Sequence, residues 1–333
     1  MNHIQGSGGQ APHHRANIAL TLNEQNMIWT LLILVAVIVA AAPFAAELLR
    51  HSPRDDRSRT DGGIALLQDG VTSFQWHGPT TPSVIVLIHG LTSPSWVFSG
   101  LIRGLNMMGY QVLTYDLYGR GLSDRPRDRQ TPQFFLHQLT ELLDEQGLEG
   151  PVSIMGYSMG GLIGSLFAAT YPDRVDRLVL LAPAGMDYTP GPLLKRAGAG
   201  GLFGNWLWQV MGPSVLREAA RRDAAGPTVV PDLPARIDAE LSRRGYLRSV
   251  LSAHRNALSV RIEDAHRDIG KIGTPVLAIW GEADAVIPAT EIGKLTQWNR
   301  NVRHQVVKGA GHALPHTAPN AIIAAVTEFL REV

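Results

Sequence analysis

A serine set between glycines is the residue of this chain whose surroundings most directly indicate chemistry. The run GYSMGG, residues 156–161, ends the apolar segment PVSIM and opens a helical pattern. The pattern G-x-S-x-G between a strand and a helix is typical of a turn so sharp that the serine hydroxyl projects above a sheet. A helix starting directly after Ser158 also aims its positive dipole end where negative charge would develop. The sequence therefore predicts that Ser158 is a nucleophile; the alternative is a tight turn with an incidental serine.

A general base and an orienting carboxylate follow downstream. A serine hydroxyl is a weak nucleophile at neutral pH and requires a base, which a carboxylate holds in the right tautomer. Asp284 lies in GEADAVIP, just past the strand-like segment PVLAIWG, and His312 ends the segment GAGH after the next strand. We predict His312 as the general base and Asp284 as its orienting acid. The alternatives are Glu282, Asp264 or Asp268 for the acid and His304 or His316 for the base.

Attack on a carbonyl also needs donors for the oxyanion of the tetrahedral intermediate, each worth a few kcal/mol of the barrier. We expect one donor to be the backbone N–H of Met159, the residue after the nucleophile. The second is expected from the loop HGLT, residues 89–92, with the N–H of Leu91 as the choice. His89 is expected to hold this loop by hydrogen bonding.

Strands that alternate with helices must position these residues. Strand patterns run over residues 83–90, 110–117, 151–156, 175–183, 275–281 and 302–309, and helical patterns run over 96–109, 134–147, 159–171 and 319–333. Apolar, β-branched strands alternating with helices indicate a mostly parallel central sheet that helices flank on both faces.

The chain divides by pattern into an N-terminal region and a catalytic region with an insertion. We predict a disordered tail over 1–26, a transmembrane or juxtamembrane helix over 27–50, a polar linker over 51–63, a first core part over 64–183, a mainly helical cap over 184–268 and a second core part over 269–333. The cap segment lacks strand patterns and interrupts the sheet between two strands.

The uncharged run Met27–Ala46 predicts a single-pass membrane anchor. About 20 residues span about 30 Å as a helix, which matches the hydrocarbon thickness of a bilayer. A cleaved signal peptide is the alternative, although no basic region directly precedes the run. Four arginines follow the run over residues 50–59, whereas only Arg15 precedes it, and this bias favours a cytoplasmic catalytic domain. Two aspartates lie among those arginines, so a periplasmic domain stays open.

Composition excludes several classes of protein. Of 333 residues, 45% are apolar and only 18% are charged, which favours a lipid-facing or apolar-ligand surface. The net charge of +1 comes without a basic block, so nucleic acid is not expected as a partner. The chain has no cysteine, which excludes disulfides and thiolate metal sites. No metal or cofactor is expected, and nothing in the sequence fixes the oligomeric state.

Five motifs in order resemble those of the α/β-hydrolase family over roughly residues 68–333. They are HG at 89–90, DLYGRGLS at 116–123, GYSMGG at 156–161, the G-x-x-D-x-x-x-P segment from Gly281 and G-x-G-H ending at His312. The chain order Ser, Asp, His is also that of this family. The resemblance implies the α/β-hydrolase fold with an inserted cap. With its N-terminal helix, the chain is similar to membrane-anchored bacterial phospholipases A and monoacylglycerol lipases.

The resemblance implies a serine esterase or lipase acting on a lipid or other apolar acyl ester. In the cap, the apolar segment GLFGNWLWQVMG, residues 201–212, is expected to pack on the core or to line an acyl pocket. Cleavage of a C–C bond in a keto acid, or cofactor-free perhydrolysis or haloperoxidation, is the alternative on the same residues. An acid substrate would need a cap arginine, with candidates at 217, 221, 222, 243, 244, 248 and 255. The remaining alternative is a non-catalytic ligand-binding protein.

Overall fold

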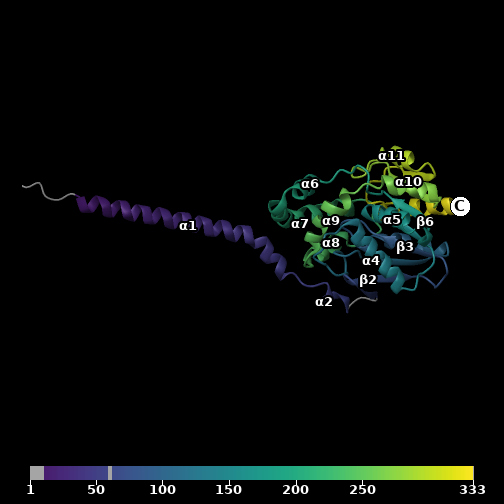
Figure 1. Cartoon of the computed structure of the whole chain (residues 1–333), viewed down its shortest axis with the longest axis horizontal. Coiled ribbons are helices and arrows are strands. Elements are labelled where there is room, and N and C mark those ends of the chain that lie inside the picture. The colour runs from purple at the N-terminus through teal and green to yellow at the C-terminus, as the bar shows by residue number, and fades with distance from the viewer. Residues whose placement is uncertain (1–10, 59–61, 333) are drawn as a thin grey trace, which may run out of the picture. The chain divides into compact units, whose positions relative to one another are not determined.

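The computed structural model describes residues 11–58 and 62–332, with side chains from residue 25 onward. The chain forms two compact units that divide between Leu48 and Leu49 (Figure 1).

The first unit is formed by helix α1 (Ala11–Leu49), except for its last residue. Its stretch Gln25–Leu49 has a mean hydropathy of 2.6 and is long and apolar enough to cross a membrane; a signal sequence would have the same properties. The prediction of a disordered tail over 1–26 is wrong from Ala11 onward. Pro12 falls in the first turn, where proline is tolerated, and residues 13–26 contain neither glycine nor proline. Residues 1–10 lie outside the described part of the chain.

The second unit is built on an eight-stranded sheet with the order β1-β2-β4-β3-β5-β6-β7-β8. The strands are β1 (Gly63–Leu67), β2 (Gly70–His77), β3 (Val84–Ile88), β4 (Gln111–Tyr115), β5 (Val152–Tyr157), β6 (Val175–Leu181), β7 (Val276–Gly281) and β8 (Val302–Val307). Strands β4, β3, β5, β6, β7 and β8 are parallel, and β1 and β2 add an antiparallel edge. The predicted mostly parallel sheet is confirmed. The hairpin β1–β2 was missed by the sequence patterns, which begin at residue 83.

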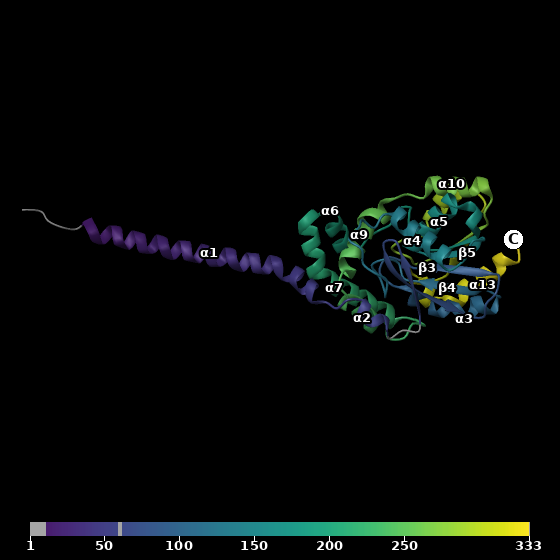
Figure 2. The same ribbon diagram turned by 60° about the horizontal axis from the view of Figure 1, so that its bottom comes forward.

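Helices cover both faces of the sheet (Figure 2). One face carries α4 (Pro132–Glu145), α5 (Met159–Thr170), α10 (Glu263–Ile272) and α11 (Glu291–Trp298), and the other carries α3 (Ser99–Met107) and α13 (Pro319–Leu330). Short helices at Ser95–Phe98 (η1), Pro172–Arg174 (η2) and Leu314–Thr317 (α12) complete the connections. Because β3, β5, β6 and β7 are sandwiched between these layers, they are almost entirely apolar.

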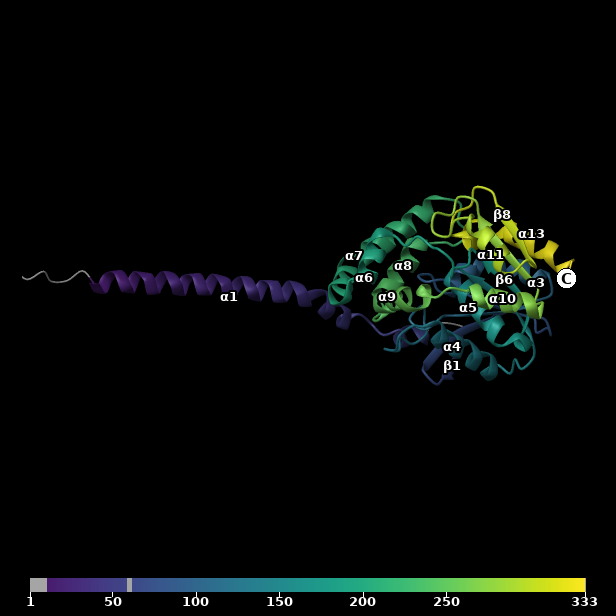
Figure 3. The same cartoon turned by 45° about the horizontal axis from the view of Figure 1, so that its top comes forward.

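The cap is the insertion between β6 and β7. It consists of α6 (Pro192–Ala199), α7 (Gly201–Ala225), α8 (Leu233–Ser242), α9 (Tyr246–Asn256) and the turn η3 (Ala257–Ser259), and Figure 3 shows α6 to α9 grouped beside one another. These helices share a small core of their own around Trp208 and Leu247. The predicted cap boundary at 268 falls inside α10, whose apolar face packs on α5 as part of the main core. The cap therefore ends near Ser259.

The segment directly after α1 is attached to the body of the second unit. It contains the short helix α2 (Arg54–Arg57). Arg57 donates to the carbonyl of Leu122 and to Asp124, each at 2.7 Å. The carbonyl of His51 accepts from the N–H of Arg244 in the cap at 2.9 Å. The part of the predicted linker that precedes residue 59 therefore has fixed partners in both core and cap.

Candidate active site

Ser158 lies in the connection between β5 and α5, and its backbone is in a strained conformation. Its φ of 52° lies in the left-handed region that non-glycine residues rarely adopt. The turn is tight enough to require glycine on both sides: a Cβ at Gly160 would lie 1.9 Å from the carbonyl oxygen of Ile88, and one at Gly156 would lie 2.3 Å from that of Gly160. This packing carries the Ser158 side chain to the edge of the sheet where the parallel strands end.

His312 and Asp284 lie in line with Ser158. His312 Nε2 is 3.0 Å from Ser158 Oγ, and His312 Nδ1 is 2.8 Å from Asp284 Oδ2. Asp284 is buried, and its other oxygen accepts from the N–H groups of Val286 and Ile287 at 2.8 and 2.9 Å. A carboxylate can only accept a hydrogen bond, and Asp284 faces Nδ1 of His312. The neutral ring therefore carries its proton on Nδ1, and Nε2 accepts from the serine hydroxyl.

The alternative residues lie elsewhere. Glu282 accepts from the N–H of Gly309 at 2.8 Å, Asp268 pairs with Lys271, His304 bonds to Trp280 and Thr296, His316 bonds to Thr228, and Asp264 lies in the first turn of α10. The structure brings none of them to Ser158.

The two N–H groups expected as oxyanion donors belong to residues beside Ser158. Met159 is the first residue of α5, where helix N–H groups lack partners within the helix. Leu91 lines the pocket at Ser158, and a Cβ at the neighbouring Gly90 would lie 3.4 Å from Ser158 Cβ. Neither N–H has a hydrogen-bond partner among residues 11–58 and 62–332.

His89 holds the loop that carries Leu91, as expected from the sequence. Its Nδ1 is 2.9 Å from the carbonyl oxygen of Gly90, and its Nε2 accepts from the N–H of Leu117 at 2.9 Å. Burial lowers the pKa of His89 to about 4, so the ring is neutral at physiological pH. A neutral ring that accepts at Nε2 must donate from Nδ1, which fixes its tautomer.

A pocket of about 150 Å³ opens at Ser158 and His312. Its wall is mainly apolar, with Leu194, Leu258, Val286 and Ile287, and Tyr188 adds an aromatic ring. The segment 201–212 of the cap does not line it. Trp208 is buried within the cap, whereas Leu202 and Phe203 are 86% and 68% exposed. The acyl-pocket role predicted for that segment is therefore not met in this structure, because α7 turns those two side chains outward.

The candidate cap arginines also lie outside the pocket wall. Arg217 pairs with Asp238, Arg243 pairs with Glu240 and Asp56, and Arg244, Arg248 and Arg255 donate to backbone carbonyls. The pocket thus presents no fixed positive charge from the described residues that line it.

Two buried residues near the site were missed from the sequence. Arg120 donates from Nε to the carbonyl oxygen of Leu91 at 2.8 Å, and Tyr246 donates from its hydroxyl to that of Thr92 at 2.8 Å. Arg120 lies in the DLYGRGLS motif, and its place in that motif could have pointed to a role near the site. No motif contains Tyr246, which reaches the loop from the cap.

Within the described ranges, no group of residues is arranged to hold a metal ion.

A mostly parallel sheet, a serine at a strand-to-helix elbow and a helical cap together define an α/β-hydrolase. Residues 80–317 match the family described as serine aminopeptidase, S33, and the chain belongs to that family.

Relatives with different activities share this family likeness. The chain is 27% identical to 2-(acetamidomethylene)succinate hydrolase of Mesorhizobium japonicum, over 74% of this chain and 87% of that protein. It is 23% identical to monoacylglycerol lipase ABHD6 of Homo sapiens, over 78% of this chain and 79% of that protein. Its fold resembles that of a bacterial membrane phospholipase A with a TM-score of 0.66 and 18% identity, over 92% of this chain and 98% of the other. These likenesses support hydrolase activity without selecting a substrate.

Proposed function

We propose that this protein is a serine hydrolase that cleaves acyl esters of the lipid class, with Ser158 as nucleophile, His312 as general base and Asp284 as the acid that orients it. The observation that carries the proposal is the line of hydrogen bonds from Asp284 through His312 to Ser158, which ends in an uncharged pocket.

The proposed reaction proceeds through an acyl-enzyme. Ser158 Oγ attacks the ester carbonyl carbon while His312 Nε2 takes its proton, and the carbonyl π electrons move onto the oxygen. The N–H groups of Leu91 and Met159 would stabilise this oxyanion. Collapse of the intermediate expels the alkoxide, which takes the proton from His312. Water, deprotonated by the same nitrogen, then attacks the acyl carbon. The bond between this carbon and Ser158 Oγ breaks, His312 returns the proton to Oγ, and the carboxylic acid leaves.

The pocket supports an apolar acyl group of limited length. A cavity of about 150 Å³ lined by Leu, Ile and Phe can hold a molecule the size of benzene, so this pocket suits a short acyl group or the first carbons of a longer chain. The exposed Leu202 and Phe203 in the cap support contact with an apolar phase. The apolar helix Gln25–Leu49 supports attachment to a membrane, where such esters concentrate.

A keto-acid substrate for C–C cleavage is less well supported. Its carboxylate would need a cation, and no arginine is among the described residues that line the pocket. Ester hydrolysis requires no charge in the pocket beyond those that develop at the reacting carbonyl.

A panel of substrates tests the proposal. We expect the purified chain to hydrolyse p-nitrophenyl esters, with butyrate or hexanoate faster than palmitate, and to release fatty acid from monoacylglycerol or lysophospholipid. A fluorophosphonate should label Ser158 and block both activities. Labelling without ester turnover, together with cleavage of a dienoic keto acid, would move the assignment to C–C hydrolysis. Absence of labelling would indicate a protein that only binds ligands.

A further inference from the structure

Three consecutive carbonyl groups in the loop after β3 are each held by a buried side chain. His89 holds the carbonyl of Gly90, Arg120 holds that of Leu91, and Tyr246 holds that of Thr92, at 2.9, 2.8 and 2.8 Å. A trans peptide points its C=O and N–H in opposite directions. The Gly90 carbonyl and the Leu91 N–H belong to the same peptide, so fixing this carbonyl directs the Leu91 N–H away from His89. Fixing the Leu91 carbonyl holds the next peptide, between Leu91 and Thr92.

Arg120 is unusual among these groups because it is a fully buried charge without a carboxylate partner in the described part of the chain. Its guanidinium donates to the carbonyls of Leu91 and Tyr118, to the Gln130 side chain and to the carbonyl of Ser249 in the cap. Burying an unpaired charge costs stability, and packing alone would be served as well by an apolar side chain. What the guanidinium adds is a set of fixed bonds that join the loop to the cap.

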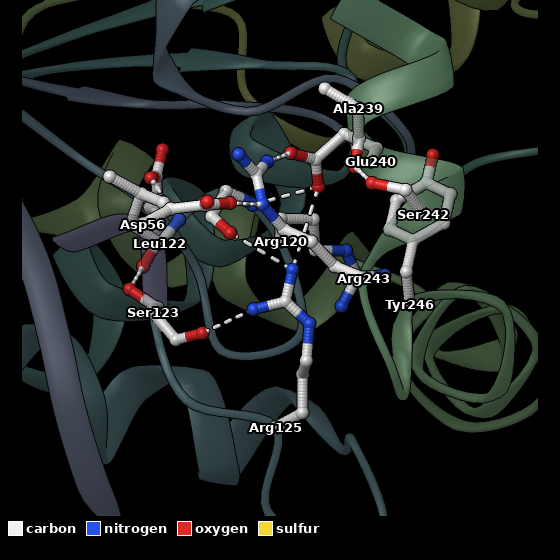
Figure 4. Close-up of polar contacts among 12 residues, drawn as sticks. Asp56, Arg120, Leu122, Ser123, Arg125, Ala239, Glu240, Ser242, Arg243 and Tyr246 are labelled. Atoms are coloured by element: carbon white, nitrogen blue, oxygen red, sulfur yellow. Dashed lines mark hydrogen bonds and ion pairs between the residues drawn. The ribbon is translucent and has the colours of Figure 1, made fainter. Parts of the chain in front are cut away.

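A second set of contacts leads from this place to the segment after α1. Glu240 in α8 accepts from the N–H of Gly121 at 2.9 Å and pairs with Arg243. Asp56 in turn accepts from Arg243 Nε at 2.9 Å. Figure 4 shows Glu240 between the guanidinium groups of Arg125 and Arg243, with Asp56 at the far side of Arg243. Glu240 is only 1% exposed and Asp56 is 24% exposed, so the series runs from the interior to the surface.

We propose that Arg120 and Tyr246 are positioning residues for the Leu91 N–H, and that Asp56 supports their arrangement through Arg243 and Glu240. This inference rests on the proposed function, because an oxyanion donor matters only where a carbonyl is attacked. The segment after the apolar helix then contributes to the rate of the reaction although it touches no substrate.

Replacing Tyr246 with phenylalanine tests the first part. Tyr246→Phe removes only the hydroxyl that holds Thr92, and Tyr118→Phe is the matched control, because the Tyr118 hydroxyl donates to the Gly70 carbonyl at 3.1 Å, away from the loop. Loss of a whole oxyanion donor lowers kcat by about 10²–10³-fold. For a displaced donor we expect a fall of about tenfold in kcat for Tyr246→Phe, with KM changed less than about twofold. Tyr118→Phe should change neither.

A trifluoromethyl ketone supplies a readout that folding stability does not affect. It forms a tetrahedral adduct with Ser158 whose oxyanion needs the same donors, so its affinity should fall by the same factor as kcat in Tyr246→Phe and stay unchanged in Tyr118→Phe. Equal behaviour of the two variants would overturn the positioning role.

Aspartate variants test the second part. Asp56→Asn should lower kcat and ketone affinity by about two- to threefold. Asp55→Asn, one residue away, should lower neither, because among the described residues the Asp55 side chain accepts only from the N–H of Ser52. Identical values of kcat and ketone affinity for the two variants would show that Asp56 does not support the loop.

If wild-type protein hydrolyses no ester but binds the ketone, the proposed function fails and the ketone affinities still decide the positioning role. If it does not bind the ketone either, both proposals fall.

Discussion

Two clusters of polar side chains in the same unit differ in how they are built. Ser158, His312 and Asp284 sit on three connections at one edge of the sheet, and their line of bonds ends at a pocket. Asp56, Arg125, Glu240 and Arg243 come from the segment after α1, the core and the cap, and their contacts run from the partly exposed Asp56 to the buried Glu240 and Arg125. The first arrangement places the Ser158 hydroxyl at a pocket, whereas in the second the charged groups pair with one another. Buried ion pairs add little net stability over apolar packing, so we interpret the second cluster as fixing how three parts of the chain fit together.

The comparison predicts that Ser158→Ala abolishes activity and leaves the fold intact. Removal of a triad nucleophile lowers kcat on the order of 10⁴-fold or more, whereas loss of one hydroxyl at the pocket should change the free energy of unfolding by less than about 1 kcal/mol. Ester turnover and urea unfolding measure the two effects, with Ser259→Ala in the cap as control. Turnover above about a tenth of the wild-type rate would contradict the assignment of the nucleophile.

Three buried histidines outside both clusters predict a loss of stability in acid. Burial lowers the pKa of His89 and His316 to about 4 and that of His266 to about 3, from 6.5 in an unfolded chain. Between these values the unfolded state binds more protons than the folded state, so stability is complete above pH 6.5 and falls as the pH falls toward 4. Each histidine contributes a slope of up to about 1.4 kcal/mol per pH unit.

Urea unfolding at pH 7, 6 and 5 checks this slope. His266→Gln should lower the slope of the free energy of unfolding against pH by the contribution of one histidine. A free energy of unfolding that is constant over this range would show that the three rings are not held neutral.

The second cluster predicts a large loss of stability from a change that leaves the hydrogen bonds between Ser158, His312 and Asp284 untouched. Glu240→Gln would leave Arg125 and Arg243 without their buried carboxylate, and breaking a buried pair on one side costs about 3–5 kcal/mol. Asp238→Asn is the control in the same helix, because its pair with Arg217 is exposed and such pairs are worth about 0–1 kcal/mol. Similar midpoints of urea unfolding for Glu240→Gln and Asp238→Asn would show that the buried ion pairs contribute no more to stability than the exposed one.

The smallest effect is expected from shortening the N-terminus. A chain that begins at Leu49 keeps Asp56 and Arg57, whereas one that begins at Ser58 loses their contacts with Arg243 and Asp124. We expect the shorter chain to be less stable by about 1–2 kcal/mol, about 1 kcal/mol for each ion pair, and the longer chain to match the full-length protein on short esters. Equal melting temperatures for the two truncated chains would show that the segment is only a spacer.

The two clusters also differ in how far the sequence could predict them. Ser158 follows from a local pattern, and Asp284 and His312 each follow a recognisable strand, so parallel pairing brings all three to one edge. The contacts of Arg120 could not be predicted in this way, because its partners Leu91 and Ser249 lie 29 and 129 residues away.

The misassigned segments have local causes. Helix α1 begins earlier than predicted, because the polar stretch over residues 13–26 has no glycine or proline that would end a helix. The hairpin β1–β2 was missed although Asp69-Gly70, where the turn meets β2, is a turn signal.

The contact between Asp56 and Arg243 joins residues 187 positions apart, which has a consequence for biosynthesis. At about 5–20 residues per second, a ribosome needs roughly 10 to 40 s to add Arg243 after Asp56. During that interval Arg57 can already reach Leu122 and Asp124, but the part of the segment that docks on the cap has no partner and stays hydrated and open to proteases. Docking of this segment on the cap is therefore a late event of folding. Arg50 is the arginine whose carbonyl accepts from Arg244 in the cap, so protection of Arg50 from trypsin would report that the cap has been completed on a nascent chain.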